Sequence, residues 1–291
     1  MAEHREGKLI LCPTPIGNLG DITPRTLEAL KNADVVCCED TRVTGKLLRA
    51  FDISCRLERL DEVKISTSAK RIIERVLLGE RIAYCSDAGM PGVSDPGLRL
   101  VDEALDQGAC VEVLPGASAV TLAFVVSGFS CQSFYFGGFF PRKGSERTRC
   151  LEQLKALDAA LIFYESPRRI VDALRSVART FPHRRVAVCR ELTKIHEEVV
   201  RGQVGDVLQE FSERLECGEI KGEVVFVIDA KSDDEAKEDH DWSMEKARAR
   251  FHELKASGDF SKKDMVKRLQ KECGLSRNEA YDLVHGEAQE C

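Results

Sequence analysis

The chain has 291 residues, 43% hydrophobic and 32% charged, enough for two ordinary domains and a small third, each with its own core. This composition excludes a disordered or fibrous chain. With 49 Asp and Glu against 43 Lys and Arg, the net charge is −6, so a histone-like protein is also excluded. Nucleic-acid binding would need a local basic surface.

The twelve cysteines contain no C-x-x-C pair, and several lie in apolar runs, among them Cys37, Cys38, Cys85 and Cys189. Free cysteine behaves as a small buried hydrophobe, so we expect reduced thiols, a reducing compartment and no metal site. The first residues carry too short an apolar stretch for a signal peptide, and no run approaches the length of a membrane helix. We therefore expect a soluble, cytoplasmic protein.

Up to residue 114, short apolar runs alternate with amphipathic stretches, which predicts an α/β domain. Thr23 and Pro24 mark one helix start, since a threonine side chain caps free N–H groups and proline at the first helical position loses no needed donor. The expected strands are 9–12, 34–38, 81–85 and 110–114, and the expected helices begin at 24, 42, 69 and 97.

After Pro115 and Gly116 the pattern changes to denser strands and fewer helices, which indicates a second α/β domain with a mixed sheet. Its expected elements are a helix at 118–127 and strands at 134–140, 160–164, 186–189, 199–200 and 224–228. The predicted domains are thus 1–117 and 118–230.

Residues 231–241 (KSDDEAKEDHD) have six acids and no large apolar residue, so we expect an unstructured acidic linker. Residues 242–291 follow as a small module of three helices, expected at 244–255, 261–272 and 276–285, with Ser261 and Ser276 as N-caps and Gly274 as a helix stop. Residues 242–278 hold ten Lys or Arg against five Asp or Glu, so the module is basic.

Three loops follow expected strands and combine glycine, proline and small polar residues: 13–21 (PTPIGNLGD), 86–97 (SDAGMPGVSDPG) and 114–119 (LPGASA). Ligands of open α/β sheets bind at the carboxyl ends of strands, and glycine lets the backbone approach a ligand closely. The first loop alone also fits a tight structural turn. None of the loops matches G-x-G-x-x-G or a P-loop, so the pattern indicates neither dinucleotide nor NTP binding. We expect the three loops to converge on one site.

Eight strings occur in the order PTPIGNLGDIT, EDTR, SDAGMPGVSDPG, LPGAS, GFFPRK, LIFYESPRR, CRELTK and KGEVVFVI. In that order they resemble the ribosomal RNA small subunit methyltransferase I family, which has the tetrapyrrole methylase fold. The resemblance implies an S-adenosylmethionine-dependent enzyme that methylates the ribose 2′-hydroxyl of a cytidine in the 16S rRNA decoding region. It also implies a homodimer, with the small ribosomal subunit as the partner.

The resemblance implies a cofactor held largely by backbone in the cleft between the two α/β domains. The residues that it assigns to this site are Pro15, Gly17, Asp87, Ala88, Gly89, Met90, Gly92, Val93, Ser118, Ala119, Tyr164, Leu192 and Gly222. One departure stands out. Where the family usually carries H-E-H-N-E, this chain has residues 61–65 (DEVKI), in which only Glu62 keeps the chemistry of its position.

Methyl transfer from a sulfonium is an in-line displacement with a neutral leaving group, so alignment is the main task of the protein and needs no metal. An acceptor near the hydroxyl would assist as its proton departs. The candidates for the catalytic site are Asp21, Glu39, Asp40, Arg42, Glu62 and Glu191, with the base unassigned. Alternatively, Asp21 caps a turn, and Glu39, Asp40 and Arg42 form an ion pair at a strand end.

Positive charge gathers after an aromatic strand and again in the C-terminal module, where it suits phosphate contacts or an ordinary solvated helix face. The predicted RNA-binding residues are Arg142, Lys143, Arg147, Arg149, Lys262, Lys263 and Arg277. Two other functions stay open. One is a methyltransferase of the same fold that acts on a small tetrapyrrole. The other is a cofactor-binding ribosome assembly factor without catalysis, which the departure at 61–65 suggests.

Overall fold

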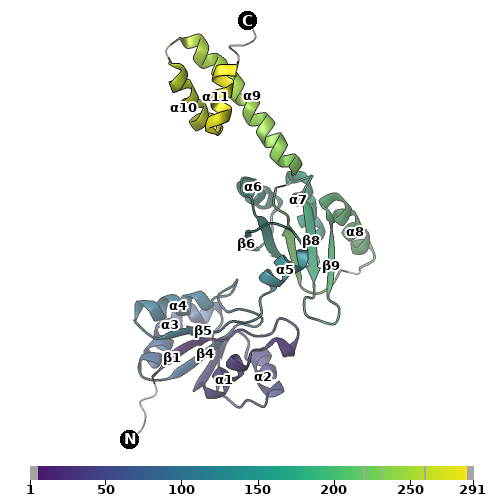
Figure 1. The fold of residues 1–291 in the computed structure, drawn as a ribbon. Helices are drawn as coiled ribbons and strands as arrows, with labels where there is room; N and C mark the ends of the chain where they lie inside the picture. The colour runs from purple at the N-terminus through teal and green to yellow at the C-terminus, as the bar shows by residue number, and fades with distance from the viewer. Residues whose placement is uncertain (1–5, 219, 232, 259, 287–291) are drawn as a thin grey trace. The chain divides into compact units, whose positions relative to one another are not determined.

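The computed structural model describes residues 6–218, 220–231, 233–258 and 260–286. The chain forms two compact units, Met1–Ala230 and Lys231–Cys291. The first unit contains two five-stranded sheets, and the second contains three helices (Figure 1). Among the described residues, no helix is long and apolar enough to cross a membrane.

The first sheet has the order β3-β2-β4-β1-β5, and all its pairs are parallel. Its strands are β1 (Lys8–Leu11), β2 (Val35–Cys38), β3 (Leu57–Arg59), β4 (Arg81–Cys85) and β5 (Val111–Val113). Four helices connect them: α1 (Pro24–Asn32), α2 (Thr41–Ala50), α3 (Glu62–Leu77) and α4 (Gly97–Asp106). Parallel strands share one carboxyl edge, so the loops after β1, β2 and β4 meet there.

Both faces of this sheet are covered, which explains why β2 and β4 read as continuous apolar runs. Leu30 of α1 and Leu48 of α2 pack on one face, and Ile72 of α3 and Leu100 of α4 pack on the other. Thr23 caps α1 by accepting a hydrogen bond from the Thr26 N–H, with Pro24 at the first helical position, as the sequence predicts.

The second sheet is mixed, with the order β6-β7-β10-β8-β9, in which only the β6–β7 pair is parallel. Its strands are β6 (Phe134–Phe139), β7 (Ala160–Glu165), β8 (Arg185–Arg190), β9 (Glu198–Gln203) and β10 (Val224–Ile228). The helices are α5 (Ala119–Ser127), α6 (Gly144–Leu154), α7 (Ile170–Thr180) and α8 (Val204–Glu216). The expectation of fewer helices here is wrong, because amphipathic α6, α7 and α8 cover one face of the sheet.

In the C-terminal unit, α9 (Asp233–Ser257), α10 (Lys262–Cys273) and α11 (Arg277–Gly286) share a small core that contains Phe251, Leu269 and Val284. Ser261 caps α10 and Gly274 ends it at φ 74°, as predicted. The unstructured linker predicted at 231–241 is wrong, since α9 begins at Asp233.

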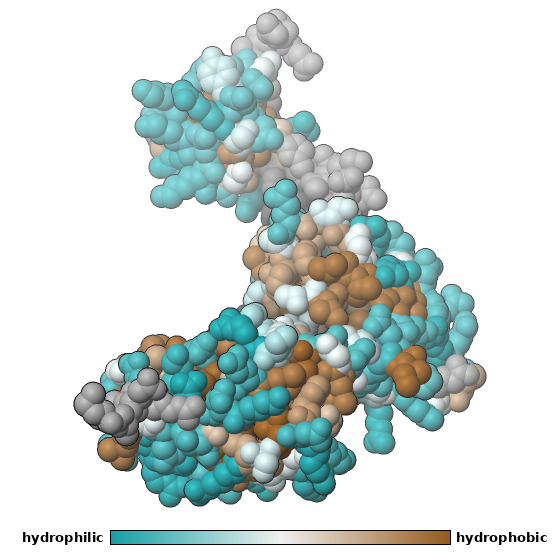
Figure 2. All heavy atoms as spheres, turned by 60° about the horizontal axis from the view of Figure 1, so that its bottom comes forward, coloured by the Kyte–Doolittle hydropathy of each residue, from teal (hydrophilic) through white to brown (hydrophobic). Residues whose placement is uncertain are grey.

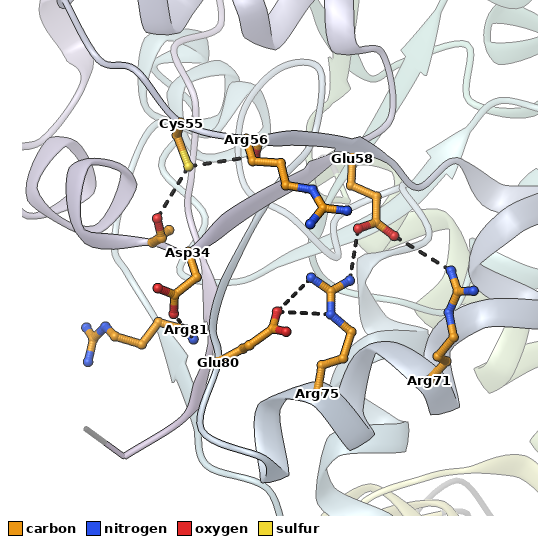
Figure 3. A network of polar contacts seen from close by, with 9 residues as sticks. Asp34, Cys55, Arg56, Glu58, Arg71, Arg75, Glu80 and Arg81 are labelled. Carbon is orange, nitrogen blue, oxygen red and sulfur yellow. Dashed lines mark hydrogen bonds and ion pairs between the residues drawn. The ribbon is translucent and has the colours of Figure 1, made fainter. Parts of the chain in front are cut away.

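An ion-pair network connects β3, α3 and the residue before β4 (Figure 3). Arg75 of α3 donates to Glu58 at 2.9 Å and to Glu80 at 2.7 Å, while Arg71 approaches Glu58 at 3.9 Å (Figure 3). Glu80 directly precedes β4, at its amino end, so this network lies away from the loops at the carboxyl ends of the strands, which are described next.

The cysteines Cys37, Cys38, Cys85 and Cys189 are free and buried, as expected.

Candidate active site

The loop after β1 and the loop after β4 are joined through their backbones. Thr14 and Gly89 exchange two hydrogen bonds, each of 3.0 Å between nitrogen and oxygen. The Asp95 carboxylate accepts from the Gly92 N–H at 2.8 Å and from the Gly97 N–H at 2.7 Å. Gly89 and Gly92 have φ values of 80° and 91°, which favour glycine. The β4 loop therefore has a fixed shape.

The ends of β2 and β4 are tied by acidic residues. The Asp87 N–H donates to Glu39 Oε1 at 3.2 Å, and the Asp40 N–H donates to Asp87 Oδ1 at 3.1 Å. Asp40 also caps α2 and holds Arg42 through its carboxylate, with a shortest distance of 2.6 Å. These contacts place the carboxylates of Glu39 and Asp87 at the same sheet edge.

The acidic candidates differ in basicity. Burial raises the pKa of Glu39, and the nearby carboxylates of Asp95, Asp87 and Asp61 raise it further against one hydrogen bond from the Asp87 N–H. Hydrogen bonds from Arg42 hold the pKa of Asp40 well below its usual value. The ammonium of Lys194 lowers the pKa of Glu191. Glu39 is therefore the best proton acceptor of these three.

A pocket of 430 Å³, which we call the cleft pocket, opens at this edge and draws its walls from both sheets of the first unit. Its lining residues are Ile16, Glu39, Ser86, Asp87, Ala88, Gly89, Met90, Val93, Ser94, Asp95, Ser118, Ala119, Phe139, Tyr164, Glu165, Ser166, Pro167, Gly222, Glu223, Val224 and Val225. Ile16 of the first loop belongs to the same hydrophobic cluster as Val225 and other residues of the second sheet.

The far wall of the cleft pocket comes from the end of β7. Tyr164 is held edge-on by Phe136 and Phe139, at ring distances of 5.0 and 5.4 Å. Next to it, the fully buried carboxylate of Glu165 pairs with Arg169 and accepts from the Ser166 N–H at 2.6 Å. This wall therefore combines the aromatic rings of Phe139 and Tyr164 with the acidic residues Glu165 and Glu223.

A second cavity of 330 Å³, which we call the side pocket, lies between the β1 loop and α2. It is lined by Thr14, Pro15, Leu19, Val43, Thr44, Lys46, Leu47, Ala50, Ser86 and Asp87. Ser86 and Asp87 line both pockets, so they form the wall between them.

The structure brings most of the expected cofactor residues together. Those that line the cleft pocket are Asp87, Ala88, Gly89, Met90, Val93, Ser118, Ala119, Tyr164 and Gly222. Pro15 lines the side pocket instead. Gly17, Gly92 and Leu192 line neither pocket: Gly17 lies against Lys194, Gly92 lies against Leu98, and Leu192 is buried in the core.

Of the expected catalytic residues, only Glu39 lines the cleft pocket. Asp40 and Arg42 form the ion pair that was the alternative interpretation. Asp21 is exposed in the short helix η1 (Leu19–Asp21), and Glu62 is exposed in the first turn of α3. Glu191 pairs with Lys194 at 2.8 Å. Within the departing segment 61–65, Asp61 caps α3 and Ile65 enters its core.

Among the expected RNA-binding residues, the prediction for Arg147 is wrong, because this residue is not on the surface. It is 5% exposed, and its guanidinium donates to the Pro141 carbonyl at 2.8 Å. Lys143 pairs with Glu146 at 3.2 Å. The remaining predicted residues are exposed: Arg142, Arg149, Lys262, Lys263 and Arg277.

Sequence reasoning missed several pocket residues, among them Asp95, Glu165 and Glu223. Asp95 lies within the second glycine-rich loop, and Glu165 lies within the string LIFYESPRR, so both strings carried a signal. Glu223 follows Gly222, which was predicted. What the sequence lacked was the pairing of β7 with β10, which places Glu165 beside Val224.

Comparisons with known proteins show the family and the fold of this chain. The family model for tetrapyrrole (corrin/porphyrin) methylases matches residues 8–208. The solved structure of uroporphyrin-III C-methyl transferase from Thermus thermophilus, complexed with S-adenyl homocysteine, has a TM-score of 0.51 and 18% identity and covers 77% of this chain and 97% of its own. Fold and pocket thus define an S-adenosylmethionine-dependent methyltransferase of the tetrapyrrole methylase class.

Two relatives show to which family within this class the chain belongs. A protein of Halalkalibacterium halodurans is 38% identical over 282 residues, which cover 97% of this chain and 96% of that protein. A protein of Thermotoga maritima is 42% identical over 214 residues, 74% of this chain and 96% of that protein. Both are named ribosomal RNA small subunit methyltransferase I. The chain belongs to this family, which confirms the resemblance seen in its motifs.

The residues of the cleft pocket fit S-adenosylmethionine, which carries a positive sulfonium beside an adenosine. Glu39, Asp87 and Asp95 line one side, and none of the described lining residues is a lysine or an arginine. Ile16, Val93 and Ala119 supply apolar contacts for an adenosine. Anionic and apolar walls together suit a ligand that is both cationic and flat.

Proposed function

We propose that this protein methylates a ribose 2′-hydroxyl of a cytidine in the 16S rRNA decoding region of the small ribosomal subunit. The name shared by its relatives supplies the substrate class. The structural observation that supports the chemistry is Glu39, a carboxylate with a raised pKa in the wall of the cleft pocket. A ribose hydroxyl is a poor nucleophile, and a more basic carboxylate accepts its proton more readily.

S-adenosylmethionine, when bound, supplies an electrophilic methyl group. The chain contributes alignment: the β4 loop fixed by Asp95 shapes one wall, and Tyr164 shapes the opposite wall. Holding two reactants in near-attack geometry is worth up to about 7–11 kcal/mol of the barrier. In the proposed step, Glu39 would accept the hydroxyl proton as the oxygen forms its bond to the methyl carbon and the bond from that carbon to the sulfonium sulfur breaks, which leaves neutral S-adenosylhomocysteine.

We further propose that the protein works in the cytoplasm as a homodimer. Figure 2 shows hydrophobic residues gathered over the part of the first unit that carries the second sheet. Among the exposed hydrophobic residues of this part are Val125 of α5 and Phe134 and Tyr135 of the edge strand β6. Large apolar side chains at an exposed strand edge are suited to contact with a second copy.

The test uses purified protein, radiolabelled S-adenosylmethionine and small subunits from cells that lack this gene. We expect label in 16S rRNA, and nuclease digestion should release it as a 2′-O-methylated dinucleotide that resists cleavage. The Glu39→Ala variant should bind S-adenosylmethionine and transfer label at least about a hundredfold more slowly. Label in a ribosomal protein or in a base would contradict the proposed reaction.

A further inference from the structure

The side pocket adjoins the cleft pocket and shares with it only Ser86 and Asp87 among the lining residues that the structure describes. Its floor and one wall come from α2, in which Val43, Leu47 and Ala50 are spaced by four and three residues and so share one helix face. Leu19 of η1 forms part of the lining from the β1 loop. Val43 is 42% exposed and Leu19 is 50% exposed, so this apolar lining is open to a ligand.

Polar and charged side chains also line this pocket: Thr14, Thr44, Lys46, Ser86 and Asp87. The Thr14 hydroxyl donates to the Ser86 carbonyl at 3.3 Å and keeps its lone pairs for a donor. The buried Thr44 hydroxyl lies by the Cys38 thiol, a weak partner, and makes no other polar contact among the described residues. That oxygen is fully buried, so the polar groups left for a ligand at this end of the slot are those of Thr14, Ser86 and Asp87, and they suit the hydrogen-bonding edges of a flat heterocycle.

Lys46 adds a positive charge to the lining. It is exposed, and within the described part of the chain it forms no ion pair. A lysine without a carboxylate partner is suited to a phosphate. The pocket thus combines features that a nucleotide requires: apolar walls for the base, hydroxyls for its edge and a cation for its phosphate.

The position of the side pocket relative to the cleft pocket decides which nucleotide it suits. Ser86 and Asp87 separate the two cavities, and Asp87 is bonded to Glu39 through its N–H. A base in the side pocket would bring its own ribose close to Ser86 and Asp87, the residues that both cavities share, and so toward the cleft pocket. Enzymes that modify a nucleotide take its base out of the stack and hold it in a pocket.

We infer that the side pocket holds the pyrimidine base of the target nucleotide, swung out of the rRNA, so that its 2′-hydroxyl faces the cleft pocket. This inference rests on the proposed function and adds where the substrate base binds. Its volume, 330 Å³, lies at the lower end of the range of about 300–1,000 Å³ for small-molecule sites, which suits one pyrimidine nucleotide.

The test is to fill the pocket. Val43→Trp places an indole among Leu19, Leu47 and Ala50, while Leu105→Trp is the matched control, since Leu105 is an exposed leucine of α4 outside the lining residues of both pockets. Calorimetry gives the affinity of each full-length variant for S-adenosylmethionine, and label transfer gives kcat/KM for small subunits from cells that lack this gene. Thermal melting reports whether each variant folds.

We expect Val43→Trp to melt and to bind S-adenosylmethionine like the unaltered protein while its kcat/KM falls at least about tenfold. Leu105→Trp should change none of the three. Full kcat/KM in Val43→Trp, or a parallel loss of S-adenosylmethionine affinity, would overturn the inference. Failure of the unaltered protein to methylate the rRNA would instead refute the proposed function.

Discussion

The backbone N–H of Asp87 donates a hydrogen bond to Glu39 Oε1 over 3.2 Å and so joins the carboxyl ends of β4 and β2. The contact orients the carboxylate of Glu39 toward the loop that shapes the cleft pocket. It also places two acids side by side, and the pKa of Glu39 rises in consequence of burial and of this crowding. Because burial and nearby acids disfavour its charged form, the ionised Glu39 carboxylate lowers the stability of the folded protein.

Glu39→Gln should therefore raise the melting temperature at pH 7–8 while lowering the methylation rate. The folded-state pKa of Glu39 is raised, so the native protein binds this proton more tightly than the unfolded chain. Its contribution to stability is present at low pH and is lost as the pH rises through the folded-state value. Melting curves from pH 4 to 8 should converge at the acid end. Glu28→Gln, at an exposed site on α1, should leave every curve unchanged.

Gly89→Ala should weaken both the fold and the cofactor site. Gly89 has a φ of 80°, where an L-residue costs about 1–2 kcal/mol, and its added Cβ would meet Ile16 of the pocket at 3.2 Å. Gly108→Ala is the control, since it has a similar φ of 71° and open space around it. We expect both variants to lose unfolding free energy through their positive φ, Gly89→Ala more because of the Ile16 contact, but a loss of S-adenosylmethionine affinity only in Gly89→Ala. Equal affinities in the two variants would assign Gly89 a purely structural role.

Local chemistry made part of this fold predictable. Thr23 and Pro24 fix a helix start by short-range hydrogen bonding, and the glycines of the β4 loop mark a backbone that other residues avoid. The burial of Arg147 was not predictable, because it depends on the Pro141 carbonyl and the ring of Phe140 coming together in space. Glu165 reaches the pocket through strand pairing, which sequence order does not give.

Arg75→Ala should destabilise the first unit by about 1–3 kcal/mol. The Arg75 side chain is 20% exposed and bridges two carboxylates, Glu58 and Glu80, which its loss leaves without this shared partner (Figure 3). Arg71→Ala should cost under about 1 kcal/mol, since Arg71 is 71% exposed and lies 3.9 Å from Glu58. Urea titration measures both. Neither variant should lose affinity for S-adenosylmethionine, because neither residue is among the lining residues of the cleft pocket or the side pocket.

A chain ending at Ala230 should fold and bind S-adenosylmethionine like the full-length protein, because the first unit has its own cores and contains the cleft pocket. The shorter Thermotoga maritima relative aligns over 96% of its length with 214 residues of this chain. Loss of the basic helical unit should weaken binding to small subunits. Each lost phosphate contact should reduce the log–log salt slope by about 0.7–0.9. Identical salt slopes for the two chains would mean that the RNA surface lies elsewhere, for example at Arg142 and Arg149.

The most direct measurement of the central claim is a map of ribose methylation across 16S rRNA, at nucleotide resolution, from cells with and without this gene. The account predicts that one cytidine of the decoding region loses its 2′-O-methyl group when the gene is absent. The unaltered gene should restore the methyl group, and the Glu39→Ala gene should not. Identical methylation maps from the two strains would contradict the account.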